Sequence, residues 1–293
     1  MMATHTPVGM IGLGLMGMAL SARLIDADMP VIGYDIDPVR CKTFSGEAAA
    51  SPAQVAARCR TIVIAVFNAR QVEAVFDELR GAGIADVLIC TTTCAPDEIT
   101  GIARRAGALG LRLVEAPISG TSAEVREGSA MALIAGRADA VDAAGPVLDI
   151  LCPRQTRVGK VGDAARTKLA INLILQNNRA ALAEGIAFAE SVGLDVAAFL
   201  GTARESAAYS RVMDTKGEKM LKRDFAAQSH IAQTLQDAEL ILEEARLHKQ
   251  HLPMTLVQTA LLRAAITLVG PDADSAALIE AIRPSPAANG VSS

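Results

Sequence analysis

The stretch VGMIGLGLMGMALS, residues 8–21, constrains the fold more than any other part of the chain. A short apolar segment runs directly into three glycines spaced Gly-x-Gly-x-x-Gly, and residues that favour helix follow. In a strand–turn–helix unit, the first glycine permits a tight turn, the second lets backbone approach a pyrophosphate, and the third lets the helix pack close to the strand. The phosphates then lie at the helix N-terminus. We therefore predict a dinucleotide-binding loop made of Gly12, Leu13, Gly14, Leu15, Met16 and Gly17.

Two other interpretations of this stretch are open. Ala19–Ala22 resembles a signal-peptide cleavage site, but no Lys or Arg precedes the apolar run, which is too short to span a bilayer. A chance cluster of glycines would also give the pattern, because a lone Gly-x-Gly-x-x-Gly is weak evidence. The rest of the chain has to decide.

Composition narrows the class of protein. A length of 293 residues suggests two domains. Aromatic residues make up 3% of the chain and the net charge is −4, which argues against binding to nucleic acid. The cysteine count is odd and no CxxC pair occurs, so we expect reduced thiols, a cytoplasmic location and no membrane partner. Cys90 with Cys94, or His248 with His251, is spaced for a metal, but buried thiols and a solvated helix face are the simpler interpretations, and we expect no metal.

An acidic residue follows the second predicted strand, which covers residues 31–35. Asp35 lies at the distance from the glycines where a carboxylate accepts hydrogen bonds from the adenosine ribose. A plain turn carboxylate is the alternative, since Asp37 and Pro38 follow. A carboxylate here would repel a 2′-phosphate, so we expect NAD as cofactor, with NADP left open by the nearby Arg40.

Strands and helices alternate up to about residue 163, which predicts an α/β Rossmann-type domain with a doubly wound sheet. Ligands bind at the carboxyl ends of such strands, where we place Phe67–Asn68, Thr92–Thr93 and Ser119–Gly120. Beyond that point, Ala- and Leu-rich segments predict only helices. We expect a dinucleotide-binding domain over 1–163 and an all-α domain over 164–293, joined by a long helix over about 164–192, with Gly193, Gly201 and Pro253 as breaks and a frayed tail from Pro284.

Lys168 and Asn172 are four residues apart on the long helix, so their side chains leave the same face. A lysine on so apolar a helix is a candidate buried amine, although a surface lysine is the usual interpretation of an isolated one. An ammonium can bond the developing oxyanion of an alcohol and exchange its proton, and desolvation would lower its pKa toward the working range. The pair therefore favours proton transfer coupled to hydride transfer.

Three segments in order resemble the β-hydroxyacid dehydrogenase family, which includes 3-hydroxyisobutyrate dehydrogenase, tartronate semialdehyde reductase and, more distantly, 6-phosphogluconate dehydrogenase. GLGLMGMAL resembles its cofactor signature, and EAPISGT at 115–121 resembles its substrate-binding DAPVSGG segment. Residues 159–172, with Lys168 and Asn172, resemble its catalytic GxxGxGxxxKxxxN segment.

The resemblance implies an NAD(P)-dependent enzyme acting on a small 3-hydroxy acid of the 3-hydroxyisobutyrate or 2-hydroxy-3-oxopropionate type, and a homodimer or homotetramer. It implies Lys168 as general acid/base, Asn172 in an orienting role, and Ser119, Gly120 and Thr121 as ligands of the substrate carboxylate. Without the resemblance, the segment Ser119–Thr121 would be interpreted as a plain Ser-Gly turn. Thr121 stands where many relatives have a second glycine, so we expect either a tighter substrate pocket or an additional hydrogen bond from Thr121 to the ligand.

Gln236 replaces a lysine that lies near cofactor and substrate in relatives, and a neutral amide cannot balance a carboxylate. Lys222, Arg211 and Arg204 are candidates to supply the charge instead. The alternatives are therefore a reductase of an imine or an uncharged carbonyl, and a non-catalytic dinucleotide-binding regulatory protein.

Overall fold

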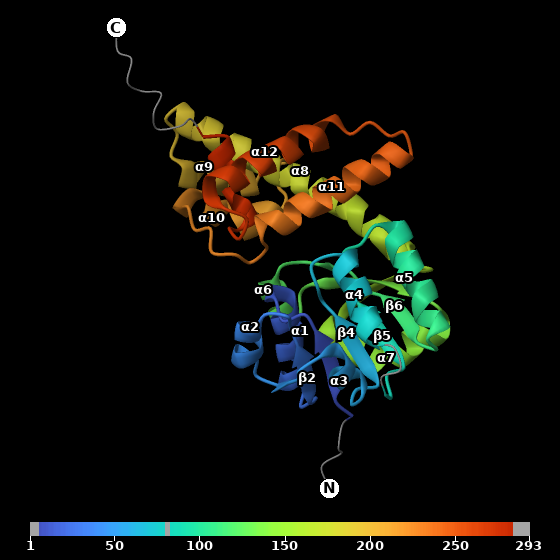
Figure 1. The fold of residues 1–293 in the computed structure, drawn as a ribbon. Helices are drawn as coiled ribbons and strands as arrows, with labels where there is room; N and C mark the ends of the chain where they lie inside the picture. The colour runs from blue at the N-terminus through green and yellow to red at the C-terminus, as the bar shows by residue number, and fades with distance from the viewer. Residues whose placement is uncertain (1–5, 80–82, 284–293) are drawn as a thin grey trace. The chain divides into compact units, whose positions relative to one another are not determined.

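The computed structural model describes residues 6–79 and 83–283, so the tail expected from Pro284 lies outside the described residues. The chain divides into two compact units, Met1–Lys168 and Leu169–Ser293 (Figure 1). We call them unit 1 and unit 2. The division between the two units falls at 168/169, whereas the sequence predicted a boundary at 163/164.

Unit 1 contains a mixed sheet with the strand order β3-β2-β1-β4-β5-β6-β8-β7, and β9 pairs with β8. The strands from β3 to β6 run parallel, β8 is antiparallel to β6 and to β7, and β9 is parallel to β8. Successive strands are thus added on both sides of the central pair β1 and β4, as the predicted Rossmann-type fold requires. The strands are β1 Val8–Ile11, β2 Val31–Tyr34, β3 Glu47–Ala48, β4 Thr61–Ile64, β5 Val87–Cys90, β6 Arg112–Glu115, β7 Ile118–Ser119, β8 Met131–Gly136 and β9 Arg154–Gly159.

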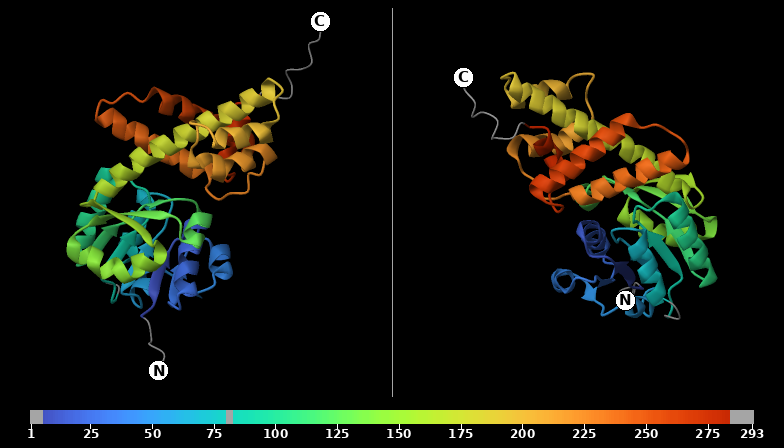
Figure 2. Two further views of the ribbon diagram at one scale, coloured as in Figure 1. Left: turned by 180° about the vertical axis from the view of Figure 1, so that it is seen from behind. Right: turned by 45° about the horizontal axis from the view of Figure 1, so that its top comes forward.

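Helices cover both faces of this sheet (Figures 1 and 2). Met10 belongs to an apolar cluster shared with α1 and α7, whereas Ile11 belongs to a second cluster shared with α3, α4 and α5. Because successive strand side chains point to opposite faces, burial of both faces gives the continuous apolar runs seen in the sequence. The helices are α1 Leu15–Asp26, α2 Pro38–Thr43, α3 Pro52–Ala56, α4 Ala69–Leu79, α5 Pro96–Ala108, α6 Ser122–Glu127 and α7 Ala138–Leu151.

Unit 2 is helical and has its own core, which includes Leu182, Ile186, Met220 and Leu262. The predicted long helix is α8, Asp163–Ser191, which crosses the division between the units. Among the described residues, none of the helices is both long and apolar enough to cross a membrane. The further elements are α9 Val196–Arg204, the π-helical turn η1 Met213–Gly217, α10 Glu218–Lys222, α11 Ile231–Leu247, α12 Pro253–Val269 and the 3₁₀ segment η2 Ser275–Ala281.

Two local expectations differ from the structure. Gly201 lies inside α9 and does not end a helix, because its open surroundings and helical neighbours tolerate it. The strand β9, with the sequence RQTRVG, was not predicted. It is mostly exposed and polar, so it lacks the apolar run that marked the buried parallel strands.

Candidate active site

The glycine loop has the geometry that its sequence predicts. Gly12 follows β1 with φ +95°, and a Cβ added to Gly17 would lie 1.8 Å from the Gly12 carbonyl oxygen. A Cβ on Gly14 would meet only Arg40 Nη1, at 3.6 Å. Gly14 is the N-cap of α1, and in this described helix neither a capping side chain nor a first-turn acid occupies the N-terminus. The backbone N–H groups there fit the phosphates of a dinucleotide.

Asp35 follows β2 and joins that strand end to the glycine loop. Its Oδ2 accepts the Leu13 N–H at 2.6 Å and lies 3.4 Å from Arg40 Nη1, while Oδ1 accepts the Asp37 N–H at 2.9 Å. The side chain is 5% exposed. An ionised carboxylate has about four acceptor positions, so hydroxyl groups can still bind to it.

Residues after β4 and β5 lie at the same edge of the sheet, because these parallel strands flank one another. The Thr92 hydroxyl donates to the Val66 carbonyl at 3.1 Å and accepts the Val66 N–H at 3.2 Å. Asn68 Oδ1 accepts the Gln71 N–H at 3.0 Å, as a helix N-cap does, and Phe67 is 41% exposed. Thr93 is half-buried just before α5, and the Thr92 bridge holds its segment to the one that carries Phe67 and Asn68.

The segment Ser119–Thr121 leads from β7 into α6. Thr121 is the N-cap of α6: its Oγ1 accepts the Glu124 N–H at 3.2 Å, and Glu124 Oε2 accepts the Thr121 N–H at 2.8 Å. This capping bond stays within α6, so it does not test the hydrogen bond to a ligand that is expected from Thr121. The Thr121 hydroxyl keeps its proton for donation to a ligand.

Lys168 and Asn172 are both buried on one face of α8. Asn172 Nδ2 donates to Asp237 Oδ2, on α11, at 2.8 Å. Because an ionised carboxylate only accepts, this bond directs the amide oxygen of Asn172 away from Asp237. Asp237 was not among the predicted site residues, and its place directly after Gln236 was the available signal. Gln236 is half-buried on α11.

Unit 2 also contains buried charges that the sequence analysis missed. Lys216 Nζ lies 2.7 and 2.8 Å from the two carboxylate oxygens of Asp274, and this pair is 2% and 0% exposed. Arg179 is buried on α8, and burial lowers its pKa to about 10, opposed by the charges of Asp274 and Asp237. Of the cations considered to replace the charge missing at Gln236, Arg204 lies 3.4 Å from Asp214 and Lys222 lies 3.2 Å from Glu218.

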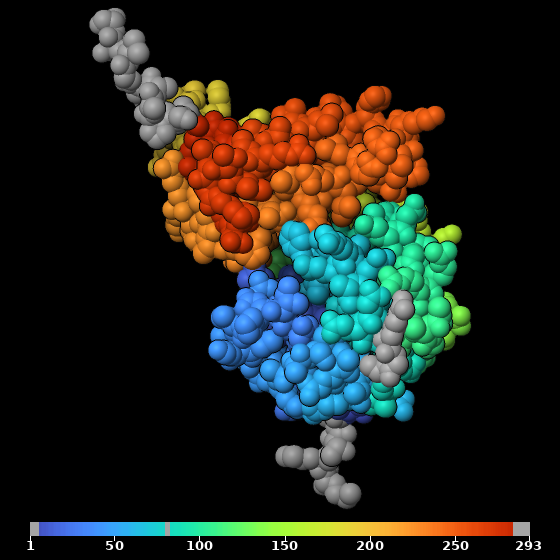
Figure 3. Space-filling view, in the orientation of Figure 1, coloured from blue at the N-terminus to red at the C-terminus, as the bar shows by residue number. Residues whose placement is uncertain are grey.

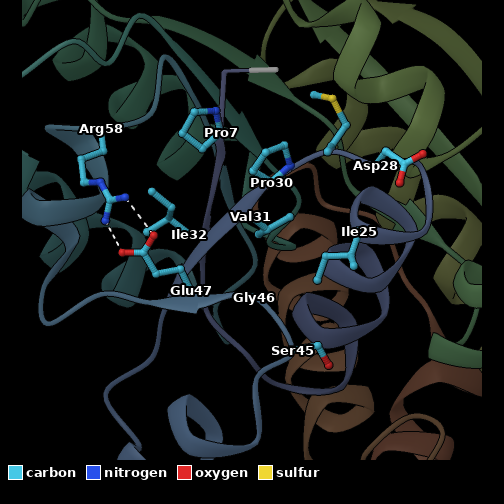
Figure 4. Close-up of a pocket in the computed structure, with 11 residues that line it drawn as sticks. Pro7, Ile25, Asp28, Pro30, Val31, Ile32, Ser45, Gly46, Glu47 and Arg58 are labelled. Atoms are coloured by element: carbon cyan, nitrogen blue, oxygen red, sulfur yellow. Dashed lines mark hydrogen bonds and ion pairs between the residues drawn. The ribbon is translucent and has the colours of Figure 1, made fainter. Parts of the chain in front are cut away.

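A hollow of about 480 Å³ opens at the other end of the sheet (Figure 4). It is lined by Pro7, Pro30 and Val31 near the starts of β1 and β2, and by the ion pair of Glu47 with Arg58. Ligands of doubly wound sheets bind at the carboxyl ends of the strands, so this hollow is not the expected site.

One member of each pair, Cys94 and His248, has a local partner. All five cysteines carry free thiols, and Cys94 Sγ lies 3.6 Å from the Thr92 carbonyl oxygen. His248 Nε2 lies 3.2 Å from Glu244 Oε1. A search of the described residues finds no group of three or more His, Cys, Asp or Glu side chains placed to hold a metal.

Family models match both parts of the chain. The NAD-binding domain of 6-phosphogluconate dehydrogenase matches residues 7–159, and the NAD-binding domain of NADP-dependent 3-hydroxyisobutyrate dehydrogenase matches residues 162–282. The chain belongs to the β-hydroxyacid dehydrogenase family. It is an NAD(P)-dependent 3-hydroxyacid dehydrogenase, and its cofactor is a nicotinamide dinucleotide.

Particular relatives match over nearly the whole chain. The 2-hydroxy-3-oxopropionate reductase of Escherichia coli is 30% identical over 285 residues, covering 94% of this chain and 96% of the relative. The L-threonate dehydrogenase of Cupriavidus necator is 29% identical over 281 residues, covering 93% and 95%. The crystal structure of 3-hydroxyisobutyrate dehydrogenase from Salmonella typhimurium shares the fold, with a TM-score of 0.84, 24% identity, and coverage of 93% and 98%.

Proposed function

We propose that the enzyme interconverts a small 3-hydroxy acid, of the 3-hydroxyisobutyrate or 2-hydroxy-3-oxopropionate type, and its carbonyl partner, with Lys168 as general acid/base. The observation that carries this proposal is the placement of Lys168 and Asn172 on one face of α8, in a chain whose first unit has an open dinucleotide loop. Two relatives are named for their substrates, 2-hydroxy-3-oxopropionate and L-threonate, and these names support the substrate class.

Lys168 exchanges the proton of the reacting oxygen. A bound nicotinamide dinucleotide supplies or accepts the hydride at the substrate carbon. In the oxidative direction the Lys168 amine accepts the hydroxyl proton, and in the reductive direction its ammonium donates that proton. Asn172, with its amide nitrogen held by Asp237, presents a fixed carbonyl oxygen that orients the amine or the substrate hydroxyl.

The segment Ser119–Thr121 binds the substrate carboxylate in this proposal. Gly120 adds no side chain between the Ser119 hydroxyl and the Thr121 backbone, and the N-terminus of α6 follows directly. Hydroxyl and backbone N–H donors suit a carboxylate. The capping bonds occupy the Thr121 and Glu124 N–H groups themselves, and they fix the backbone that carries the Ser119 and Thr121 hydroxyls.

NAD is the preferred cofactor in this proposal. Asp35, fixed by the N–H groups of Leu13 and Asp37, presents a negative charge where NADP carries its 2′-phosphate. Arg40 is 50% exposed beside Asp35 and partly offsets that charge. Fluorescence titration with NADH and NADPH tests the preference, and the variant Asp35→Asn should narrow the ratio of the two dissociation constants.

The test of the proposed chemistry follows absorbance of the reduced cofactor with a panel of 3-hydroxy acids. Lys168→Ala should lower kcat by about 10²–10⁴-fold, the usual contribution of a general acid/base, and leave dinucleotide binding nearly unchanged. The control is Lys249→Asn, which removes an exposed lysine after α11, at a positive-φ position that asparagine tolerates, and should keep most activity. Turnover retained by Lys168→Ala would overturn the assignment.

Gln236 favours a second candidate substrate, an imine or an uncharged carbonyl. The amide cannot neutralise a carboxylate, and Arg204 and Lys222 already have acidic partners. Each acid in the panel should therefore be paired with its methyl ester or amide. A higher kcat/KM for the uncharged member would establish this alternative.

We further propose that a second copy of the chain covers the outer faces of α8 and α12, giving a homodimer or homotetramer. Ile174 and Phe188 on α8, and Met254, Val257 and Leu268 on α12, are 60–67% exposed. Their spacing follows the helical repeat, so each helix carries an apolar stripe, and α12 lies on the surface of unit 2 (Figure 3). Monomers rarely expose large contiguous apolar patches. Light scattering that gives a monomeric mass would refute this assembly.

A further inference from the structure

Glu115 ends β6 as a buried carboxylate, 2% exposed. A buried charge is unfavourable unless hydrogen bonds compensate for its lost hydration. Burial raises the pKa of Glu115, while backbone N–H groups at the start of α8 act against that rise. The residue opens the EAPISGT segment, yet its chemistry is not that of a substrate ligand, because its oxygens are engaged elsewhere.

Both oxygens of Glu115 bind the start of α8. Oε2 accepts the Gly162 N–H at 2.7 Å, and Oε1 accepts the Ala165 N–H at 2.5 Å. The first N–H groups of a helix have no partner within the helix, and a side chain at the N-cap usually supplies one. Here the carboxylate comes from a strand 47 and 50 residues earlier in the chain. Asp163, the local acid, instead accepts the Lys160 N–H at 3.1 Å.

Two bonds from one planar group to two different amides fix the helix against both sliding and rotation. Lys168 lies three residues beyond Ala165, about 4.5 Å further along the helix axis. Its distance from the reacting oxygen therefore depends on where the first turn is held. Ser119 lies four residues beyond Glu115, so one residue ties the segment of Ser119 to the helix of Lys168.

We propose that Glu115 is a positioning residue that sets the place of Lys168 by anchoring the first turn of α8. The inference rests on the proposed role of Lys168. A misplacement of about 1 Å can lower a rate by about 10²-fold, so the expected effect is on kcat more than on binding.

The test is the variant Glu115→Gln, which keeps the shape of the side chain but turns an NH₂ donor toward one of the two N–H donors. We expect kcat to fall by about tenfold to a hundredfold, with the dissociation constant of NADH changed less than about twofold. The matched control is Asp195→Asn at the start of α9, where a carboxylate accepts the N–H groups of Ala197 and Ala198 at 2.9 and 3.1 Å. It makes the same chemical change at another helix and should leave kcat unchanged.

A double-mutant cycle separates positioning from general destabilisation. If Glu115 acts through Lys168, then Glu115→Gln should not lower the residual rate of Lys168→Ala any further. Additive losses would overturn the inference. Full turnover in Lys168→Ala would instead overturn the proposed function, whatever Glu115→Gln does.

Hydrogen exchange on the unaltered protein provides a second measurement, which tests the anchor on which the proposal depends even if Glu115→Gln does not fold. The Ala165 amide should exchange as slowly as amides inside α8, although first-turn amides ordinarily exchange fast. Fast exchange at Ala165 would refute the anchor.

Discussion

Gly14 and Gly17 are both part of the glycine motif, yet an added methyl group should have opposite consequences at the two positions. At Gly17 the new Cβ would lie 1.8 Å from the Gly12 carbonyl oxygen, whereas real contacts of this kind stay at 3.0 Å or more. The helix and the strand end must therefore separate by about 1.2 Å, the difference of those two distances. At Gly14 the new Cβ meets Arg40 Nη1 at 3.6 Å, an ordinary contact, and the backbone is extended.

These distances give the expected magnitudes. Overpacking of a core costs about 1–3 kcal/mol, so Gly17→Ala should lower the melting temperature by several degrees. Gly14→Ala should change stability by less than about 1 kcal/mol, because Gly and Ala differ modestly at an N-cap. The added methyl group would nevertheless occupy the place where a pyrophosphate approaches the backbone. We therefore expect NADH to bind about tenfold more weakly, which corresponds to about 1.4 kcal/mol of lost binding free energy.

Thermal unfolding and NADH titration measure the two effects separately. Gly101→Ala, in the middle of α5 with no atom within 4 Å of the added Cβ, is the control. It should raise stability by about 0.5–1 kcal/mol and leave NADH binding unchanged. Tight NADH binding by Gly14→Ala, or an unchanged melting temperature for Gly17→Ala, would refute the assignment of roles within the loop.

Three further outcomes are expected. Asp274→Ala leaves Lys216 as an uncompensated buried charge and should cost about 3–5 kcal/mol in urea unfolding, whereas Glu239→Ala in the exposed pair with Arg263 should cost less than about 1 kcal/mol. Although burial raises it, the Lys216 charge and backbone N–H groups hold the pKa of Asp274 below its ordinary value. Its stabilisation is then present above an aspartate's ordinary pKa of about 3.9 and is lost as pH falls from there through the lower folded-state pKa, so Asp274→Asn should show a shallower decline in stability below about pH 4 than the unaltered protein. Burial raises the pKa of Cys59 and of Cys152 to about 11, so at pH about 8 an aromatic disulfide reagent should label the half-buried Cys41 fast and the other four thiols only after unfolding.

Local signals were sufficient for much of the fold. Pro253, predicted as a break between helices, begins α12, because proline suits the first turn of a helix and cannot continue a preceding one. The long helix α8 ends one residue before its predicted end. The polar strand β9 escaped prediction because its place at the sheet edge is decided by pairing with β8.

Local geometry at the candidate site could be predicted where residue spacing alone sets it. Four residues along a helix place Lys168 and Asn172 on one face, and the glycine spacing sets the loop. The partners of these residues could not be read in the same way. Asp237 lies 65 residues from Asn172, and the amides that Glu115 binds lie 47 and 50 residues away, so only the tertiary fold pairs them. The roles given to the individual site residues remain predictions for the experiments above.

The bond between Asp35 and the Leu13 N–H has a consequence for redesign of cofactor preference. The acid that faces the ribose in our proposal is also the acceptor that secures the phosphate loop, at 2.6 Å. Replacing it with Ser or Ala to admit a 2′-phosphate would therefore remove a loop contact together with the charge. Asn keeps a carbonyl oxygen for Leu13 and is the less disruptive exchange. Selection for NADP would thus favour asparagine first, with the larger changes following only after the loop gains another support.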